Sequence, residues 1–378
     1  MQVSNPFTLK VIASPESFCN RTREQKDLVS YAKSGTNLVL YSPRRYGKTS
    51  LIRLVQKRLK DDHGFLTSYT DFFAITSIED IAQRIAMSIY KMLEPNQGLF
   101  KKSLKFLQTF RPSFQPTADG SGFNLTVQQV STGLSGIDLL EKTMEDLGMF
   151  LEATNVLVQI TFDEFQEITE LKAPEIEGVL RKHIQEHRAS YFFVGSRRRV
   201  LLNIFVQQKR PFYQSALTYQ LKKLPREDFK IFLRDKFFQA GRECPQAIID
   251  SILDISSCHP YYTQKLAFFI FQSFHEDHTI NDDDFQKAFR EFLEAESMIF
   301  EFMLQGLSPR QIAFLKALSR EPSSSVLSGK YMQKHGLKSI GGVQSAIKRL
   351  ESLDFIEKDD NQVWCVVDPV FGRWFKAR

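Results

Sequence analysis

The sequence of 378 residues contains no long apolar run. Its mainly apolar runs, such as residues 156–160 and 191–194, are far shorter than the roughly 20 residues that a helix needs to cross a bilayer. Residues 1–10 are polar and mixed, without the pattern of a secretion leader. The four cysteines lie far apart and form no C-x-x-C pair for zinc or redox chemistry. These absences predict a soluble protein of the reducing cytoplasm with no membrane partner.

Residue groups for metal or covalent chemistry are also missing. Among the seven histidines, His183 and His187 lie four residues apart on a predicted helix but lack a third ligand. No serine lies in a nucleophile elbow, and there is neither an internal repeat nor a low-complexity tract. Hydrophobic residues (42%) and charged residues (25%) have ordinary globular proportions, so the chain can bury the cores of two or three domains.

The first half of the chain alternates between strand and helix patterns. Short β-branched and apolar segments, typical of buried strands, occupy residues 37–41, 65–73, 156–162 and 190–194. Apolar residues at helical spacing occupy residues 49–60, 77–93 and 174–187. This alternation predicts an α/β fold in which a parallel sheet carries helices on both faces.

Three domains are expected along the chain. Residues 1–220 form the α/β core, residues 221–304 an all-helical domain and residues 305–378 a third domain. A β-hairpin insert is predicted at about residues 112–130, where alternating segments flank a D-G-S-G turn at 119–122. The third domain shows a helix, a short helix, a helix and a two-stranded ribbon, which is the order of a winged helix.

The segment from Ser42 to Thr49 has the pattern of a phosphate-binding loop. It lies between a predicted strand and helix and fits G-x-x-x-x-G-K-[ST] everywhere except at Ser42. Lys48 would reach the β- and γ-phosphates, the Thr49 hydroxyl would bind Mg²⁺, and Gly47 supplies a permissive backbone. A small serine is expected to replace the first glycine at the cost of some strain. The alternative is an ordinary strand–helix turn with a surface lysine.

The candidate nucleotide-binding residues of this segment are the loop and the start of its helix. They are Ser42, Pro43, Arg44, Arg45, Tyr46, Gly47, Lys48, Thr49 and Ser50. The side chains of Arg44 and Arg45 have three directions open to them: solvent, a neighbouring subunit or the phosphates.

Further polar residues follow two later strands. Asp163 and Glu164 come after residues 156–162, at the strand end where open α/β sheets bind ligands. Asp163 is expected in the Mg²⁺ shell, and Glu164 is placed to polarise the water that attacks the γ-phosphate. The alternative for this pair is a helix N-cap. After the strand at 190–194, Arg197 is the first choice and Ser196 the second for sensing the γ-phosphate, against a plain basic surface turn. The predicted catalytic residues are therefore Lys48, Glu164 and Arg197, and the predicted metal ligands are Thr49 and Asp163.

The net charge of +6 is concentrated at the C-terminal end. Residues 306–378 carry seven Lys and five Arg against four Asp and three Glu, which leaves the remainder close to neutral. With a recognition helix at about 339–353, the candidate DNA-contacting residues are Lys338, Ser345, Lys348 and Arg349. Alternatively the winged helix packs on the α/β core as a switch or oligomerisation element, since Asp359 and Asp360 in the predicted wing would repel phosphate.

Taken together, these residues resemble the archaeal-type ATPases of the STAND branch of P-loop NTPases, which are relatives of the AAA+ proteins. The resemblance covers essentially the whole chain. Its motifs are N-P-F at 5–7, F-x-x-R-x-x-E at 18–24, P-R-R-Y-G-K-T-S at 43–50, T-F-D-E-F-Q at 161–166, G-S at 195–196, P-F-Y at 211–213 and C-H-P-Y-Y at 258–262. Origin-recognition and clamp-loader-type AAA+ proteins join the same three domains, but they usually have a glycine inside the phosphate loop, and residues 43–46 contain none.

The resemblance implies a nucleotide-binding core, a helical lid and a winged-helix domain. It also implies that Phe18 and Arg21 lie beside the adenine and that Pro260 faces the nucleotide from the other side. The sequence departs from the family at Ser42, and at Cys258 where glycine is common. These departures bear on affinity and turnover rate more than on binding itself.

The expected function is a Mg²⁺-dependent switch that binds and slowly hydrolyses ATP and couples its nucleotide state, ATP or ADP, to the winged helix. Its expected partners are the nucleotide, DNA through the winged helix, and a protein partner or a second copy of the chain. The alternative is a scaffold that holds nucleotide without hydrolysing it and acts on DNA or protein. Hydrolysis that depends on Glu164 separates the two.

Overall fold

The protein is described here by a computed structural model of residues 5–9, 18–116, 123–130, 133–273, 279–359 and 361–378. The predicted hairpin turn at 119–122 and Asp360 lie outside these residues. The chain divides into two compact units. The sheet unit comprises Arg21–Arg44 and Lys48–Lys222, and the helical unit comprises Met1–Asn20, Arg45–Gly47 and Lys223–Arg378. No helix in the described ranges is long and apolar enough to span a membrane.

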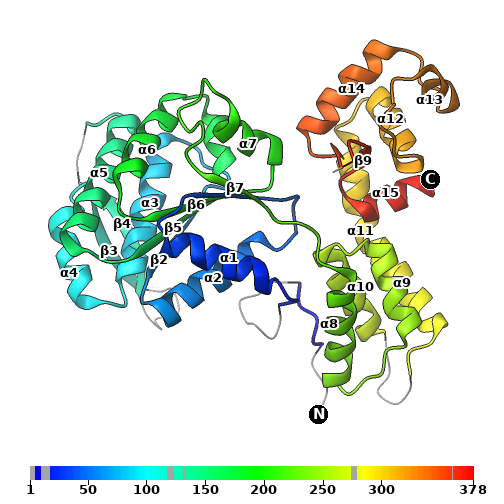
Figure 1. The fold of residues 1–378 in the computed structure, drawn as a ribbon, viewed down its shortest axis with the longest axis horizontal. Helices are drawn as coiled ribbons and strands as arrows, with labels where there is room; N and C mark the ends of the chain where they lie inside the picture. Colours follow the sequence, from blue (N-terminus) through cyan, green and yellow to red (C-terminus); the bar gives the residue numbers. More distant parts are fainter. Residues whose placement is uncertain (1–4, 10–17, 117–122, 131–132, 274–278, 360) are drawn as a thin grey trace. The chain divides into compact units, whose positions relative to one another are not determined.

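A five-stranded parallel sheet forms the centre of the sheet unit (Figure 1). Its strands, in the order β2-β5-β6-β1-β7, are β2 (Leu66–Asp71), β5 (Val158–Asp163), β6 (Ser190–Gly195), β1 (Leu38–Tyr41) and β7 (Leu217–Gln220). The predicted parallel sheet is thereby confirmed. The sequence pattern does not predict β7, because this strand is short and lies partly exposed at the sheet edge. Strand β6 separates the phosphate-loop strand β1 from the acidic strand β5.

Helices cover both faces of this sheet (Figure 1). On one face α1 (Thr22–Lys33) packs against α2 (Lys48–His63), and on the other α3 (Ile78–Leu93), α5 (Gly136–Thr154) and α6 (Glu175–Glu186) pack together. The short helices η2 (Phe165–Leu171) and α7 (Arg198–Val206) follow β5 and β6. Every residue of β5 and β6 is buried. In β6 this matches the continuous apolar run of residues 191–194, whereas β5 also buries the polar residues Gln159, Thr161 and Asp163.

An insert lies between α3 and α5. It consists of α4 (Gln97–Phe106) and an antiparallel pair, β3 (Phe110–Pro116) and β4 (Phe123–Gln129). The buried carboxylate of Asp146 on α5 holds the junction, because it accepts hydrogen bonds of 2.7 Å from the backbone N–H groups of Gln108 and Thr109 and from the Thr109 hydroxyl. These contacts anchor the insert to the sheet unit at the end of α4.

From Lys223 onward the helical unit consists of long helices followed by a small mixed module (Figure 1). The long helices are α8 (Arg226–Gln239), α9 (Gln246–Ser256), α10 (Pro260–Gln272) and α11 (Asp282–Gln305). The module comprises α12 (Pro309–Arg320), α13 (Gly329–Lys334), α14 (Ile340–Ser352), β8 (Ile356–Lys358), β9 (Trp364–Val366) and α15 (Pro369–Lys376). Ser308 and Gln311 form a capping box at the start of α12, with Pro309 at the first helical position, which together stabilise the helix start. The module has the predicted winged-helix order.

The winged-helix module packs on the long helices of its own unit. Helix α11 has 24 residues and continues up to the module, and one hydrophobic core runs through both parts. The Trp374 indole N–H donates to the Ser297 hydroxyl at 3.0 Å, and the rings of Phe300 and Phe371 lie 5.3 Å apart. The Tyr262 hydroxyl of α10 also donates to the Asp368 carboxylate at the start of α15. These buried contacts join the module to α10 and α11.

Candidate functional site

The phosphate loop joins the end of β1 to the start of α2. The Lys48 side chain is buried, and its ammonium group donates hydrogen bonds to the carbonyl oxygens of Ser42 (2.9 Å) and Pro43 (3.0 Å). Gly47 has a φ of 85°, a conformation that is strained for residues with a Cβ. The loop therefore brings a lysine and the N-terminus of a long helix to one point, an arrangement that binds phosphate oxygens.

Ser42 does not strain the loop in the way that the missing glycine suggests. The residue is buried, and it is not one of the described residues with positive φ. Its hydroxyl donates to the Pro43 carbonyl oxygen at 3.3 Å and lies 3.4 Å from the Lys48 ammonium. The backbone at this position therefore accepts a small side chain, and the expected strain is absent.

Asp163 ends β5 and faces the start of α2. Its carboxylate accepts a hydrogen bond of 3.0 Å from the Thr49 hydroxyl and another from the Tyr69 hydroxyl of β2. Burial, with a contribution from the charge of Glu164, raises the pKa of Asp163. Burial also raises the pKa of Tyr69, so its hydroxyl keeps its proton and remains a donor. A carboxylate and a hydroxyl thus meet beside the phosphate loop.

Glu164 turns toward the neighbouring strand β6. Its carboxylate accepts hydrogen bonds from the Ser196 hydroxyl, at 3.0 and 3.1 Å to the two oxygens, and from the Gln166 amide. Glu164 precedes η2 but makes no side-chain capping bond to it, so the N-cap alternative does not describe its carboxylate. A Cβ on Gly195 would meet the Gln166 amide oxygen, so a larger residue at this position would displace the Gln166 side chain that holds Glu164.

The Arg197 side chain points to η2 and not to Glu164. Its guanidinium forms ion pairs with Glu167, at 3.4 Å, and with Glu170, both on η2. Of the two candidate γ-phosphate sensors, Ser196 is therefore the one that contacts Glu164. The sheet order explains this, because β6 lies between β1 and β5 and its carboxyl end emerges between the phosphate loop and the acidic pair.

A buried polar network fixes α2 against the acidic strand. The Gln56 amide of α2 donates to the Ser68 carbonyl oxygen (2.9 Å), the Gln159 side-chain oxygen (2.9 Å) and the Thr161 hydroxyl (3.2 Å). All of these side chains are buried, so their hydrogen bonds resist displacement of the helix. The network sets the position of Lys48 and Thr49 relative to Asp163.

The sequence motifs do not assign a role to three contributors, Tyr69, Gln56 and Gln166. One signal for the network was present, because Gln159 and Thr161 are polar residues inside an otherwise apolar strand, and buried polar groups need partners. Their partner Gln56 lies about 100 positions earlier in the chain, so no local pattern connects them.

The residues that the resemblance associates with the adenine are distributed over both units. Arg21, in the sheet unit, is buried and donates to Glu24 at 2.7 Å, while its second terminal nitrogen is buried with no hydrogen-bond partner among the described residues. Phe18 and Pro260 belong to the helical unit, where Pro260 is the first residue of α10. A buried guanidinium nitrogen without a partner favours a polar or anionic ligand beside Arg21.

The three loop residues Arg45–Gly47 group with the helical unit. Within it the Tyr46 ring lies 4.8 Å from the ring of His259, and the Arg45 guanidinium lies 4.3 Å from the centre of the Tyr261 ring. Arg44 is exposed. Of the three directions open to the arginines, Arg44 takes the solvent, and Arg45 makes a cation–π contact with Tyr261.

The predicted DNA-contacting residues all lie on one exposed side of the winged helix. Helix α14 buries Val343, Ala346 and Leu350 against its module. The exposed residues on or beside it include Lys338, Ser345, Lys348 and Arg349, which form no ion pair within the described residues. Asp359 of the predicted wing uses its carboxylate locally, since it accepts from the backbone N–H groups of Asn361 and Val363 at 2.9 Å.

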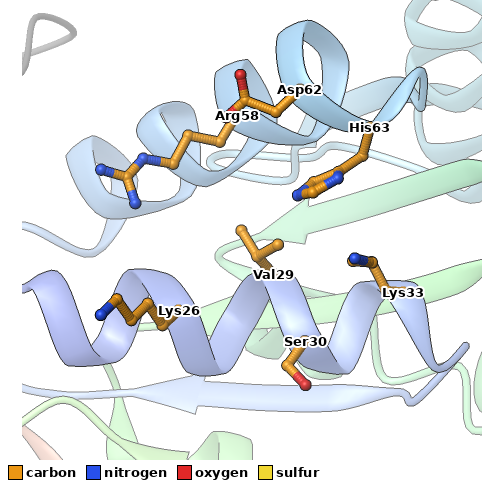
Figure 2. Close-up of a pocket in the computed structure, with 7 residues that line it drawn as sticks. All are labelled: Lys26, Val29, Ser30, Lys33, Arg58, Asp62 and His63. Carbon is orange, nitrogen blue, oxygen red and sulfur yellow. The ribbon is translucent and has the colours of Figure 1, made fainter.

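A hollow of about 350 Å³ between α1 and α2 lies away from the phosphate loop. Figure 2 shows Lys26 and Lys33 of α1 on one side of it and Arg58 and His63 of α2 on the other. Lys33 and His63 lie in the last turns of their helices, where the helix dipole favours cations. Arg58 follows Lys48 by ten residues, or about 15 Å along α2. This hollow is therefore separate from the candidate nucleotide site.

The oxygen atoms beside the phosphate loop suit magnesium, and they are too few for a metal ion that is bound by protein ligands alone. The described residues contain no group of three or more His, Cys, Asp or Glu that could hold a metal ion. Magnesium needs no such group, because it usually takes one or two protein oxygens together with waters and substrate phosphates. The Thr49 hydroxyl and the Asp163 carboxylate, 3.0 Å apart, supply oxygens of this kind.

Comparisons with known proteins agree with this architecture. Residues 298–377 match a family described as a probable winged helix domain. No curated protein matches the sequence. The solved structure of the Walker-type ATPase Paby2304 of Pyrococcus abyssi is similar, with a TM-score of 0.70, 17% identity and coverage of 98% of this chain and 99% of that chain.

Two Aeropyrum pernix proteins are also similar. The ORC2 protein in its ADPNP–ADP complexes has a TM-score of 0.61 and 15% identity, and covers 100% of this chain and 96% of that one. The ORC1 protein in complex with DNA has a TM-score of 0.51 and 13% identity, with coverage of 96% and 94%. The chain therefore has the fold of archaeal Walker-type ATPases and ORC proteins, with a winged-helix domain at its C-terminal end.

Proposed function

We propose that this protein is a Mg²⁺-dependent ATPase of the STAND type, in which bound nucleotide sets the state of a winged-helix domain. The observation that carries the proposal is the convergence of three groups at the carboxyl ends of β1, β6 and β5. These groups are the Lys48 ammonium, the Thr49–Asp163 pair and the Glu164–Ser196 pair. They supply a phosphate cation, metal-binding oxygens and a positioned base.

Nucleotide binding would use the phosphate loop from Ser42 to Ser50. The Lys48 ammonium exchanges the loop carbonyls for β- and γ-phosphate oxygens, and the first N–H groups of α2 donate to the phosphates. Arg21 and Phe18 beside the adenine, with Pro260 opposite, remain proposals from the family resemblance. The buried, unpartnered nitrogen of Arg21 supports its place in that set.

Magnesium would be held by the Thr49 hydroxyl, with Asp163 in its shell directly or through water. When bound, the ion supplies charge neutralisation at the β- and γ-phosphate oxygens. Burial disfavours the charged form of Asp163, and a cation at this point offsets that penalty. The Tyr69 hydroxyl keeps the carboxylate oriented toward Thr49.

Glu164 is the proposed general base. It would accept a proton from the water that attacks the γ-phosphate, while Lys48 stabilises the charge on the phosphate oxygens. The Ser196 hydroxyl and the Gln166 amide hold the carboxylate between β5 and β6. We assign Ser196 the position beside the γ-phosphate. Arg197, the residue that the sequence favours, reaches that position only if it leaves Glu167 and Glu170.

The winged helix is the proposed output of the switch. In the proposed division, residues 1–220 bind nucleotide, residues 221–304 form the lid and residues 305–378 form the winged helix. Because the winged helix packs on α10 and α11, a movement of the lid would carry it along. The exposed cations of α14 support DNA as its target, and a protein partner or a second copy of the chain is the other proposed target.

A second candidate function is a scaffold that holds nucleotide without hydrolysing it and acts on DNA or protein. The exposed cationic side of α14 favours it, because that surface does not depend on turnover. The two functions share the phosphate loop and differ at Glu164.

Hydrolysis of ATP by the full chain with Mg²⁺ tests the proposal. Lys48→Ala should lose ATP binding and hydrolysis, whereas Glu164→Gln should bind ATP and hydrolyse it at least about 100-fold more slowly. Lys57→Ala, which changes an exposed lysine of α2, should match the wild type. Absence of ATP binding would overturn the site. Binding without turnover, unaffected by Glu164→Gln, would favour the scaffold.

A further inference from the structure

The insert carries a cationic surface that the proposed ATPase mechanism does not use. We define the insert surface as Lys101, Lys102 and Lys105 of α4 together with Arg111 and its polar neighbours on the β3–β4 hairpin. All four basic side chains are exposed. The Arg111 guanidinium donates to the Leu104 carbonyl oxygen at 2.6 Å, which places this cation beside the end of α4. None of the four forms an ion pair within the described ranges of the chain.

Carboxylates are nearly absent from this part of the chain. Between Glu94 and Asp138 the sequence contains a single acidic residue, Asp119, against four basic ones. The carboxylate of Asp146, the acidic group bonded to the junction, is buried and accepts hydrogen bonds from Gln108 and Thr109. Lys105 lies in the last turn of α4, where the helix dipole favours cations, but Lys101 and Lys102 precede that turn.

The hairpin shows two different faces. One face buries Phe110, Leu125 and Val127 in the core of the sheet unit. The strand register places uncharged hydrogen-bonding side chains together with Arg111 on the opposite face, in the pairs Arg111–Gln128, Ser113–Thr126 and Gln115–Asn124. That face therefore offers amides, hydroxyls and one guanidinium, and no carboxylate.

We infer that the insert surface is a second DNA-binding surface, which contacts duplex DNA independently of α14. A group of exposed cations without ion-pair partners among the described residues matches the phosphate backbone. A two-stranded ribbon fits the major groove, where amide and guanidinium groups can bond to base edges. The inference rests on the proposed function in one respect, because the DNA contact proposed for α14 is the reason for naming duplex DNA as the polyanion. The insert surface itself is identified from its own charges.

The insert lies apart from the candidate nucleotide site. Its strands pack on α3, which lies beside the edge strand β2, and in Figure 1 α4, β3 and β4 occupy the side of the sheet unit away from β7. The phosphate loop follows β1, which is separated from β2 by two strands. Substitutions on the insert surface should therefore leave ATP hydrolysis unchanged, which provides a check that the variants fold.

Fluorescence anisotropy of a labelled DNA duplex with the full chain tests the inference. Lys101→Glu/Lys105→Glu should raise the Kd at least about tenfold at moderate salt. Lys101→Ala/Lys105→Ala should reduce the slope of log K against log salt by about 1.8, or about 0.9 for each lost phosphate contact. The matched control Lys57→Glu/Lys60→Glu changes two exposed lysines of α2 and should have a clearly smaller effect.

The outcomes separate this inference from the DNA contact proposed for α14. A loss of affinity in the insert variant with normal binding by Lys348→Glu/Arg349→Glu would support the insert and contradict α14. The reverse result would overturn the insert surface and leave α14 standing. Equal losses in the insert and control variants, or no duplex binding by the wild type, would also overturn it. Binding of the protein to anionic vesicles, with no binding to duplex DNA, would likewise overturn the inference.

Discussion

The candidate nucleotide site and the exposed side of α14 are both polar, but they differ in how their side chains are held. Asp163 and Glu164 accept hydrogen bonds from neighbouring strands and from α2. Lys348 and Arg349 are exposed on a helix whose opposite side alone is packed. The first arrangement is pre-organised for one geometry, as chemistry requires. The second leaves cations free to adapt to a phosphate backbone, which requires charge more than a fixed position.

This contrast predicts that single substitutions act strongly at the nucleotide site. Ser196→Ala should lower the rate of ATP hydrolysis by about 10- to 100-fold with little change in ATP affinity, because it leaves the Gln166 amide as the one side-chain donor among the described residues that holds the Glu164 carboxylate. Arg197→Ala is the matched control and should have a smaller effect, since it removes the ion pairs to η2 and leaves the Ser196–Glu164 contact in place. Steady-state rates with measured ATP dissociation constants check both. A larger loss in Arg197→Ala would restore arginine as the sensor.

The buried network under the phosphate loop should be the next most sensitive. Gln56→Ala removes the amide that donates to the Ser68 carbonyl oxygen and to the side-chain oxygens of Gln159 and Thr161, which keep only their hydrogen bonds to each other. It should therefore lower the free energy of unfolding by about 1–3 kcal/mol. Gln83→Ala, on the exposed side of α3, should change it by less than about 0.5 kcal/mol. Urea unfolding of both variants measures this difference. Equal midpoints would show that the network does not hold α2.

Burial of His187 makes the stability of the sheet unit depend on pH. Burial, with the charge of His183, lowers the pKa of His187 from 6.5 to about 4. The unfolded chain therefore binds more protons than the folded one between about pH 6.5 and 4, and stability falls as pH is lowered through this range. His187 should cost about 2 kcal/mol of stability on going from pH 7 to pH 5.

Comparison with His187→Gln isolates this effect, because other groups titrate in both proteins. The urea midpoint of the wild type should fall more between pH 7 and pH 5 than that of the variant. Identical pH dependence would show that His187 does not contribute.

The exposed side of α14 should show the smallest single effects. Lys348→Ala and Arg349→Ala should each weaken duplex DNA binding only a few-fold, and each should reduce the salt slope by about 0.9. Neither should change the urea midpoint, since both side chains are exposed. Lys376→Ala on α15 serves as the control for a general loss of charge. A loss of DNA affinity of more than 100-fold from one substitution would indicate a buried, specific contact. The side chains of α14 would then be held as firmly as those of the nucleotide site.

Much of the site could be predicted because its chemistry is contiguous in sequence. The G-K-T and D-E strings each follow an apolar strand pattern, and parallel strands bring their carboxyl ends to one edge. The choice between Ser196 and Arg197 could not be made in this way. It depends on which neighbouring side chains compete for the arginine, and Glu167 and Glu170 lie on η2, outside any motif.

The sequence by itself determined the parallel α/β sheet, the phosphate loop, the acidic pair and the winged-helix order, because each depends on local periodicity or on a short motif. Only the tertiary structure decided which groups hold Asp163 and Glu164, that Ser42 carries no left-handed strain, and that the winged helix packs on α10 and α11. These features join residues far apart in the chain, such as Tyr69 with Asp163 and Tyr262 with Asp368. Long-range hydrogen bonds between single residues leave no periodic trace, so packing alone reveals them.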